Sequence, residues 1–270
     1  MGLNRDPSII TPTLSAFDKQ QRRKLWQAVL LQDTFFTVIL NLPPTATHTD
    51  VKVEDLTDCE IEDGANGASA NEATDICFVR SMWTLANLVQ KSLCFPRSLS
   101  LPIASNAPER ARIIGRFQSL YASFPQPFRS FNEASICELA SRNKRLARQT
   151  LFLTSNYFHC LMLVCADESD VLGVDVKGTL EAAHEAINSF FMLHALFEDE
   201  ARVWYHFQHR AFSEAVRIRT SFLPWNRLVG TSLTRGGGRL SMLLRSWLKT
   251  GGEAWSWIPC ICGRKRTWCG

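Results

Sequence analysis

Residues 133–168 read EASICELASRNKRLARQTLFLTSNYFHCLMLVCADE, and the second half of this stretch is apolar on nearly every side. Apolar residues recur along it at the spacing of one helix face: Ile136, Leu139, Ala147, Leu151, Tyr157, Leu161 and Val164. A single helix of that length would extend about 54 Å, whereas a compact body the size of the first four fifths of the chain is about 45 Å across. We therefore expect a long central helix that either crosses the whole domain or breaks once.

The rest of the chain up to residue 217 shows the same helical periodicity. We expect further helices at residues 17–41, 75–95, 108–124, 179–197 and 199–219. No stretch there alternates apolar and polar residues as a half-buried strand does. The sequence therefore predicts an all-α protein, an irregular multi-helix bundle with mobile loops, among them residues 57–74.

The helix expected at 17–41 carries an apolar stripe that we take to be its inner face: Trp26, Val29, Leu30, Phe36 and Leu40. Ser15 is its expected N-cap, and Pro43 follows its end. Asp33 lies in the middle of the stripe, where an unpaired buried carboxylate would be costly. We therefore expect Asp33 to accept hydrogen bonds or to meet an arginine from another helix, with a ligand or catalytic role as the alternative.

The formal charge of +4 hides an uneven distribution along the chain. Residues 1–216 hold 20 Lys and Arg against 25 Asp and Glu, whereas residues 217–270 hold 10 against 1. The slightly acidic first part excludes nucleic-acid binding through bulk charge. We expect a folded domain at residues 1–217 and a poorly structured basic tail at 218–270. A basic arm that contacts phosphate backbones is the alternative for the tail.

The chain has nine cysteines, an odd number, and its N-terminus lacks the apolar core of a signal peptide. We therefore expect reduced thiols in a nuclear or cytosolic protein. The most apolar window, residues 151–166, is shorter than the roughly 20 residues that span a membrane, and the polar Asn156 and His159 interrupt it. The sequence predicts no membrane partner.

Two histidine pairs and one acidic run are candidates for metal or acid–base chemistry. His206 and His209 are spaced to reach one metal ion from one helix, but further ligands are missing and their aromatic neighbours favour packing. His184 and His194 are interpreted as a hydrogen-bonded pair at the edge of the core. The run Asp167–Asp170 resembles the acidic clusters of helical terpenoid synthases but lacks their adjacent aspartates, so a solvated helix end explains it better.

The cysteines of the tail and the common catalytic motifs give no stronger sign of an enzyme. Cys260, Cys262 and Cys269 supply three thiols where zinc takes four ligands. The sequence contains none of the motifs G-x-S-x-G, G-x-G-x-x-G and G-x4-G-K-[ST]. A helical metal-dependent enzyme that uses His206 and His209 or the acidic run is kept only as an alternative.

Several short segments near the start of the chain follow the order of a known family. They are Gly2-Leu3-Asn4-Arg5-Asp6-Pro7, Gln21-Arg22-Arg23-Lys24-Leu25-Trp26, Asp33, Pro43 and Asp50-Val51-Lys52-Val53. They resemble the run G-L-H-R-D-P, R-R-R-L-W-W, Asp, G-R-P and D-V-D-V-P of the regulatory (middle homology) domain of fungal zinc-cluster transcription factors. The resemblance covers about residues 1–217, and it departs where Asn41-Leu42-Pro43 replaces G-R-P and Gln27 replaces a second Trp.

The resemblance implies structural roles for the matching residues Gly2, Arg5, Asp6, Pro7, Arg22, Arg23, Trp26, Asp33 and Pro43. It implies a nuclear regulatory domain that contacts other transcription-factor domains, co-regulators or a small-molecule effector. Zinc and DNA would be bound only by the family's separate six-cysteine cluster, whose spacing this sequence lacks, so we expect no cofactor in this chain. The sequence would then start inside the domain and leave an apolar face open for a partner. DNA or RNA contact through the basic tail is the alternative.

Overall fold

The computed structural model of the 270-residue chain describes residues 4–46, 56, 75–129, 132–169 and 172–228. These residues form two compact units. Unit 1 comprises Met1–Ser130 with Asp167–Val174, and unit 2 comprises Phe131–Ala166 with Asp175–Gly270. All regular structure in the described ranges is helical, which confirms the prediction of an all-α protein.

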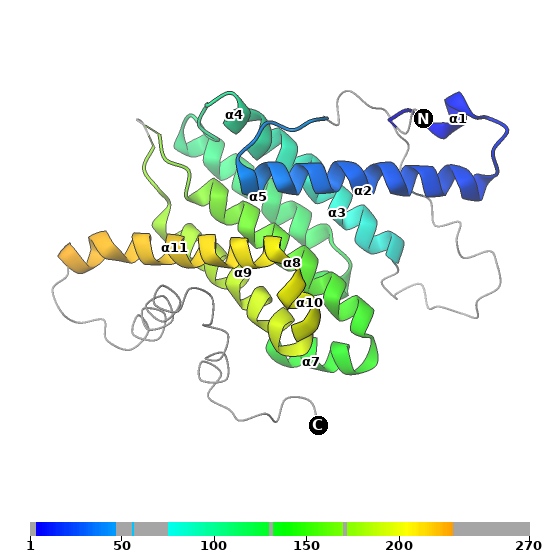
Figure 1. Ribbon diagram of the computed structural model, residues 1–270. Coiled ribbons are helices and arrows are strands. Elements are labelled where there is room, and N and C mark those ends of the chain that lie inside the picture. Colours follow the sequence, from blue (N-terminus) through cyan, green and yellow to red (C-terminus); the bar gives the residue numbers. More distant parts are fainter. Residues whose placement is uncertain (1–3, 47–55, 57–74, 130–131, 170–171, 229–270) are drawn as a thin grey trace. The chain divides into compact units, whose positions relative to one another are not determined.

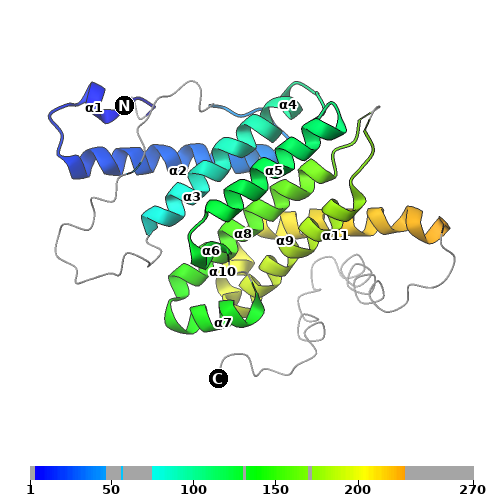
Figure 2. The same cartoon turned by 180° about the vertical axis from the view of Figure 1, so that it is seen from behind.

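Unit 1 is built on α2 (Ala16–Leu40), α3 (Asp75–Val89) and α5 (Ala107–Ser123), with α3 in contact with both α2 and α5 (Figures 1 and 2). The helices predicted at 17–41 and 108–124 correspond to α2 and α5, and each observed helix begins and ends one residue earlier than predicted. Unit 1 also contains three single-turn helices: α1 (Pro7–Ile10), α4 (Phe95–Ser98) and α6 (Gln126–Arg129). The sequence analysis missed these because four residues are too few to show a helical period.

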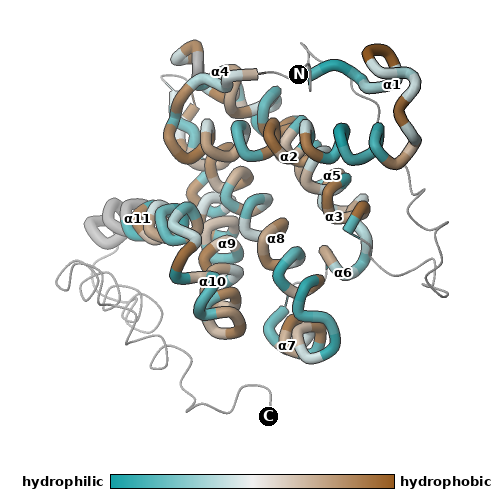
Figure 3. Tube along the Cα trace, turned by 45° about the vertical axis from the view of Figure 1, so that its right-hand side comes forward, coloured by the Kyte–Doolittle hydropathy of each residue, from teal (hydrophilic) through white to brown (hydrophobic). Residues whose placement is uncertain are grey.

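The buried face of α2 differs from the one that its hydropathy predicts. Val29, Phe36 and Leu40 of the predicted inner stripe are 49%, 49% and 57% exposed. The buried residues on α2 are Gln20, Arg23, Gln27, Leu30, Thr34, Phe35, Thr37 and Val38. Apolar residues gather in the second half of α2 (Figure 3), and they include the exposed Phe36 and Leu40 as well as the buried Phe35 and Val38. The predicted inner face was therefore wrong for these three residues, although Leu30 is buried, and polar residues such as Arg23 and Thr34 take other buried positions with hydrogen-bond partners from outside α2.

Helix α3 runs directly into a π-helical segment, η2 (Gln90–Cys94), and then into α4. The register change is visible at Phe95, whose N–H donates to the carbonyl of Gln90, five residues earlier. Pro96 lies in the first turn of α4, within this continuous helical run. The helical run therefore extends beyond the predicted end at residue 95 to Ser98.

Unit 2 contains the long helical stretch that opens the sequence analysis. It breaks once, into α7 (Glu133–Arg142) and α8 (Lys144–Cys165), at Asn143, whose side chain accepts the Leu146 N–H at 3.0 Å as the N-cap of α8. The apolar second half of the predicted stretch lies in α8 and is largely buried, with Leu151 and Met162 fully covered. Within the described residues, no helix is both long and apolar enough to cross a membrane.

The remaining helices of unit 2 are α9 (Val176–Leu196), α10 (Glu198–Val203) and α11 (Tyr205–Leu228), and α9 packs along both α8 and α11 (Figure 1). The helix predicted at 199–219 is interrupted at Trp204, whose ring packs on Phe152 and Phe207. Helix α11 then continues past the predicted domain boundary at 217 to Leu228. The expected loop at 57–74 and residues 229–270, with Cys260, Cys262 and Cys269, lie outside the described residues.

Candidate functional site

Two residues of the N-terminal motif, Asp6 and Arg23, form a buried ion pair between α1 and α2. Arg23 Nε and Nη2 donate to the two carboxylate oxygens of Asp6 at 3.1 and 3.0 Å. The Asp6 carboxylate also accepts the Ser8 N–H at 2.8 Å and so caps α1. A bidentate pair of this geometry fixes both the position and the orientation of the short helix. One residue from each of the two motifs, Asp6 and Arg23, therefore meets the other in space at a corner between α1 and α2.

The other motif residues surround that corner or lie along α2. Arg22 Nη1 donates to Thr11 Oγ1 at 3.3 Å, and the buried Pro7 starts α1. Arg5 and Pro43 are exposed, and Trp26 is half-buried. Gly2 lies outside the described residues. None of these motif residues lines the cleft described below.

Asp33 holds the chain where it turns back after α2. Its carboxylate accepts the Thr45 hydroxyl at 2.6 Å and the N–H groups of Thr45 and Ala46 at 3.0 and 3.4 Å. Asp33 is half-buried and forms no ion pair with an arginine among the described residues. Of the two expected alternatives, accepted hydrogen bonds are therefore the one that the structure shows. Thr45, its main partner, lies twelve residues later in the chain. The position of Asp33 within the apolar stripe of one helix could not predict that contact.

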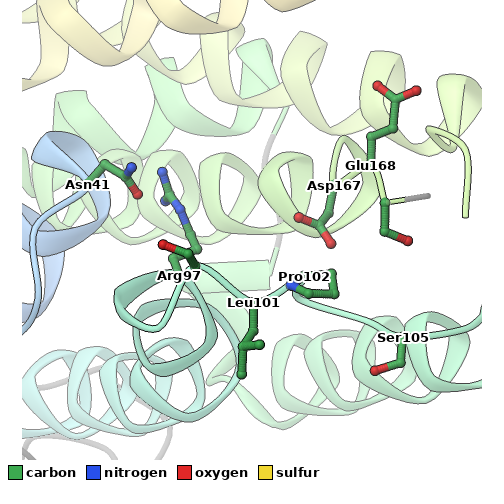
Figure 4. A pocket seen from close by; sticks show the side chains of 9 residues that line it. Asn41, Arg97, Leu101, Pro102, Ser105, Asp167 and Glu168 are labelled. Atoms are coloured by element: carbon green, nitrogen blue, oxygen red, sulfur yellow. The ribbon is translucent and has the colours of Figure 1, made fainter. Parts of the chain in front are cut away.

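An open cleft of about 610 Å³ lies entirely within unit 1 (Figure 4). Its lining comes from three distant parts of the sequence: Asn41 at the end of α2, the stretch from Arg97 to Ser105, and Asp167 to Ser169. The lining residues are Asn41, Arg97, Ser100, Leu101, Pro102, Ser105, Asp167, Glu168 and Ser169. The volume lies in the range of small-molecule sites. This cleft is the candidate functional site.

Two lining residues have an uncommon backbone conformation. Asn41 and Ser100 have φ values of 54° and 56°, and among the described residues they are the only non-glycine residues with positive φ. The left-handed region is accessible to asparagine at moderate cost and is disfavoured for serine. Such conformations concentrate at functional sites, where the surrounding structure holds them. The Arg97–Ser105 wall and the neighbouring end of α2 therefore each contain one such residue.

The acidic wall of the cleft belongs to a segment that we call the strap, residues 167–169 and 172–174. The strap leaves unit 2 after α8, contributes to unit 1, and returns to start α9. Asp167 Oδ2 accepts the N–H groups of Ile103 and Ala104 at 2.8 and 3.4 Å. The interpretation of this run as a solvated helix end is therefore wrong for Asp167, whose carboxylate binds backbone from a distant loop. Asp170 lies outside the described residues.

Arg110 on α5 holds the strap at both of its ends. Its Nη1 donates to the carbonyl of Gly173 at 2.7 Å, and its Nη2 donates to the carbonyl of Asp167. Arg110 is only 6% exposed, so these bonds form away from bulk water. Where the chain re-enters unit 2, the Asp175 N–H donates to the carbonyl of Cys165 at 3.0 Å. The strap is therefore a short, pinned excursion between two helices of unit 2.

Unit 2 contains a buried polar network between α8 and α11. Arg210, 2% exposed, donates to Asn156 Oδ1 and, at 2.7 Å, to Ser155 Oγ. Beside it, His159 Nδ1 lies 2.8 Å from Glu214 Oε1. Burial lowers the pKa of the Arg210 guanidinium below its usual range, while the nearby Glu214 carboxylate opposes that shift. Asn156 and His159 are the polar residues that interrupt the apolar window at 151–166. Their contacts with Arg210 and Glu214 explain why polar residues occur there.

The candidate histidines do not converge on a metal. His206 is half-buried against the rings of Phe152 and Phe207, and burial first, then Arg210, lowers its pKa to about 4. His209 is exposed. His184 is also exposed whereas His194 is buried, so the interpretation of these two as a hydrogen-bonded pair is wrong. Across the described parts of the chain, no three His, Cys, Asp or Glu residues are grouped as metal ligands.

Comparison with known families decides the class of protein. The family model described as "fungal specific transcription factor domain" matches residues 1–153, more than half of the chain. The chain belongs to this family. The match includes all of the N-terminal motif and the Arg97–Ser105 wall of the cleft, and it ends within α8. The family is one of transcription regulators and is not a known enzyme family. No curated protein and no solved structure matches the chain.

Proposed function

We propose that this domain controls transcription from the nucleus through contacts with other transcription-factor domains, co-regulators or a small-molecule effector. Membership of the fungal transcription factor domain family supports a regulatory role. The slightly acidic charge of residues 1–216 argues against direct DNA binding by this part of the chain. We assign DNA and zinc binding to a separate six-cysteine cluster of the family, and we propose neither a cofactor nor a catalytic role for this chain.

The observation that carries the proposal is the pair of hydrogen bonds that Arg110 donates to the strap, at the carbonyls of Gly173 and Asp167. The strap lines the cleft and is covalently continuous with α8 and α9. A ligand or partner that contacts Asp167, Glu168 or Ser169 therefore acts on residues directly joined to the packed helices of unit 2. Packed helices switch between discrete arrangements rather than deforming continuously. The strap is thus the element through which binding at the cleft would change the state of unit 2.

A reporter assay tests this proposal. The full chain is fused to a heterologous DNA-binding domain and a constitutive activation domain, and reporter output is measured at matched protein levels. Arg110→Met removes both strap bonds, and we expect it to change the output by about tenfold, the effect of a coupling free energy of about 1.4 kcal/mol. Arg112→Met is the matched control because Arg112 lies on the same helix, is 63% exposed and pairs only with Glu109 at 3.6 Å among the described residues.

A second variant tests whether a change in reporter output comes from the strap contacts and not from a general loss of folding. Asp167→Ala removes the carboxylate that accepts the N–H groups of Ile103 and Ala104. It leaves Arg110 and the backbone carbonyl of residue 167 in place. We expect it to shift the output in the same direction as Arg110→Met, with circular dichroism unchanged. Equal reporter output from the parent, both strap variants and the control would overturn the proposal.

A further inference from the structure

Helix α2 exposes a stripe of uncharged side chains to solvent, which we call the seam. The exposed residues between positions 25 and 40 all belong to it: Leu25, Ala28, Val29, Gln32, Phe36 and Leu40. The one charged residue in this part of the chain, Asp33, is half-buried and accepts the Thr45 hydroxyl. A helix face that meets only water normally carries charged and polar residues. The seam is therefore suited to contact with another apolar surface.

The spacing of the seam is that of a helix-packing stripe. From Leu25 to Leu40 its members follow one another at intervals of three or four residues. Side chains at these intervals project from one side of a helix and interdigitate with those of a second helix that crosses at a shallow angle. Leu25 is 52% exposed, and Val29, Phe36 and Leu40 are exposed to a similar extent. About half of each large side chain therefore remains accessible to a partner.

The seam is complementary to itself when two copies of α2 pack antiparallel about a twofold axis close to Gln32. Leu25 of one copy then faces Leu40 of the other, and Val29 faces Phe36. A large side chain thus meets a smaller one, whereas a parallel pair would set Phe36 against Phe36. Gln32 meets Gln32, and an amide can bond its own kind because it carries both donors and an acceptor. Reciprocal contacts of this kind define an isologous dimer.

The size of the seam predicts a reversible dimer. If about 100 Å² of each half-exposed large side chain is covered, two copies bury roughly 900 Å² once the two smaller residues are included. Stable complexes bury more than about 1,200 Å², and smaller interfaces belong to weak and transient ones. We therefore expect a dissociation constant between about 1 μM and 1 mM.

We propose that the seam docks a second copy of this chain, α2 against α2 in antiparallel orientation with Gln32 near the twofold axis. This inference goes beyond the proposed function and uses neither the cleft nor the strap. The seam has no charge that would select an acidic or a basic partner. Its own sequence supplies the matching side-chain sizes and the matching amide, so a second copy is the occupant that fits it.

Sedimentation equilibrium of the purified full chain, from about 5 to 500 μM, tests the dimer across the expected range. We expect the average mass to rise with concentration above the 30.5 kDa of one chain. Val29→Lys places a charge in the seam opposite Phe36 and should weaken the dimer about tenfold or more. Val203→Lys is the matched control, the same substitution at a 74% exposed position of α10, and should leave the affinity unchanged.

A charge exchange tests the orientation. Leu25→Glu and Leu40→Lys should each weaken the dimer, because each leaves a charge against an apolar side chain. The double variant Leu25→Glu/Leu40→Lys should dimerise more tightly than either single variant, because opposite charges then face each other at both ends of the antiparallel pair. Since both positions are exposed, circular dichroism and melting temperature should match those of the parent.

The inference has three refuting outcomes. A mass of one chain at every concentration would overturn it, and a lower melting temperature in Val29→Lys would then show that another part of the chain covers the seam. An undiminished dimer in Val29→Lys would place the contact on a different face. A double variant weaker than both single variants would exclude the antiparallel arrangement. None of these outcomes depends on the reporter assay of the proposed function.

Discussion

Replacing Arg210 by methionine should destabilise unit 2 more than the loss of a surface arginine. Arg210 is 2% exposed, and its guanidinium lies 4.5 Å from the ring centroid of Phe207 while donating to Asn156 and Ser155. Methionine fills a similar volume but donates no hydrogen bond. The amide oxygen of Asn156 would therefore stay buried without this donor, and Glu214 would lose a nearby positive charge.

The magnitude follows from the burial of the whole network. Each hydrogen bond that a charged group makes in the interior contributes about 1.5–3 kcal/mol, Arg210 makes two, and the apolar packing of methionine offsets part of their loss. We expect a loss of about 3 kcal/mol in the free energy of unfolding. That loss corresponds to a fall of about 10 °C in the melting temperature. Urea denaturation and thermal melts followed by circular dichroism measure both quantities.

Two further variants make the Arg210 prediction specific. Arg202→Met breaks an exposed pair with Glu198 at 2.6 Å on α10, and we expect a change of about 0.5 kcal/mol or less. Combining Arg210→Met with Glu214→Gln should cost less than the sum of the two single losses, because both residues belong to one buried network in which Glu214 also contacts His159. A loss in Arg210→Met no larger than that in Arg202→Met would refute this account of the network.

Three other changes test the remaining contacts. Arg23→Met leaves the buried Asp6 carboxylate unpaired, so it should lower the free energy of unfolding by about 3–5 kcal/mol in urea titrations, and a near-parental midpoint would contradict the buried pair. Asp33→Ala removes hydrogen bonds at a half-buried turn, so calorimetry should show a loss of only about 1 kcal/mol, and a loss as large as that of Arg23→Met would contradict this. His206 has its pKa lowered from 6.5 to about 4, so the unfolded chain binds the proton more readily between these values, and stability should fall as the pH drops through this window. His206→Phe should flatten the pH dependence of the melting temperature from pH 6.5 to 4, and an unchanged slope would contradict that cause.

Much of the fold follows from the sequence because helical periodicity and capping are local signals. Ser15 caps α2 as predicted, and the long stretch at 133–168 breaks once, at an asparagine that caps the next helix. The all-helical class follows from the same periodicity. These features depend on neighbours within one or two helical turns, which a single sequence displays.

The face of α2 could not be predicted because it depends on distant partners. Thr34 is buried and receives the Gln90 amide at 2.9 Å from η2, and Arg23 is buried against Asp6. Assigning the buried face of a helix from hydropathy assumes that buried residues are apolar. The assignment fails where buried polar side chains bond to residues elsewhere in the chain. The apolar residues left on the other face are the half-exposed Val29, Phe36 and Leu40.

The cleft could not be predicted for a similar reason. Its walls come from Asn41, the Arg97–Ser105 stretch and the strap, which no local motif relates. Asp167 drew attention as part of an acidic run, but its role depends on the N–H of Ile103, far earlier in the chain. Arg110 carries no signal in the sequence beyond its place on a helix. Its importance comes from two backbone carbonyls that only the fold brings to it.

Hydrogen exchange read by mass spectrometry tests the proposed coupling role of the strap most directly. The measurement compares amide exchange at the end of α8 and the start of α9 in the parent, Arg110→Met and Arg112→Met. We predict faster exchange at both helix ends in Arg110→Met alone, because releasing the strap frees the segments that continue from it. Unchanged exchange at both helix ends, with any difference confined to α5, would contradict the claim that the strap transmits a signal between the cleft and unit 2.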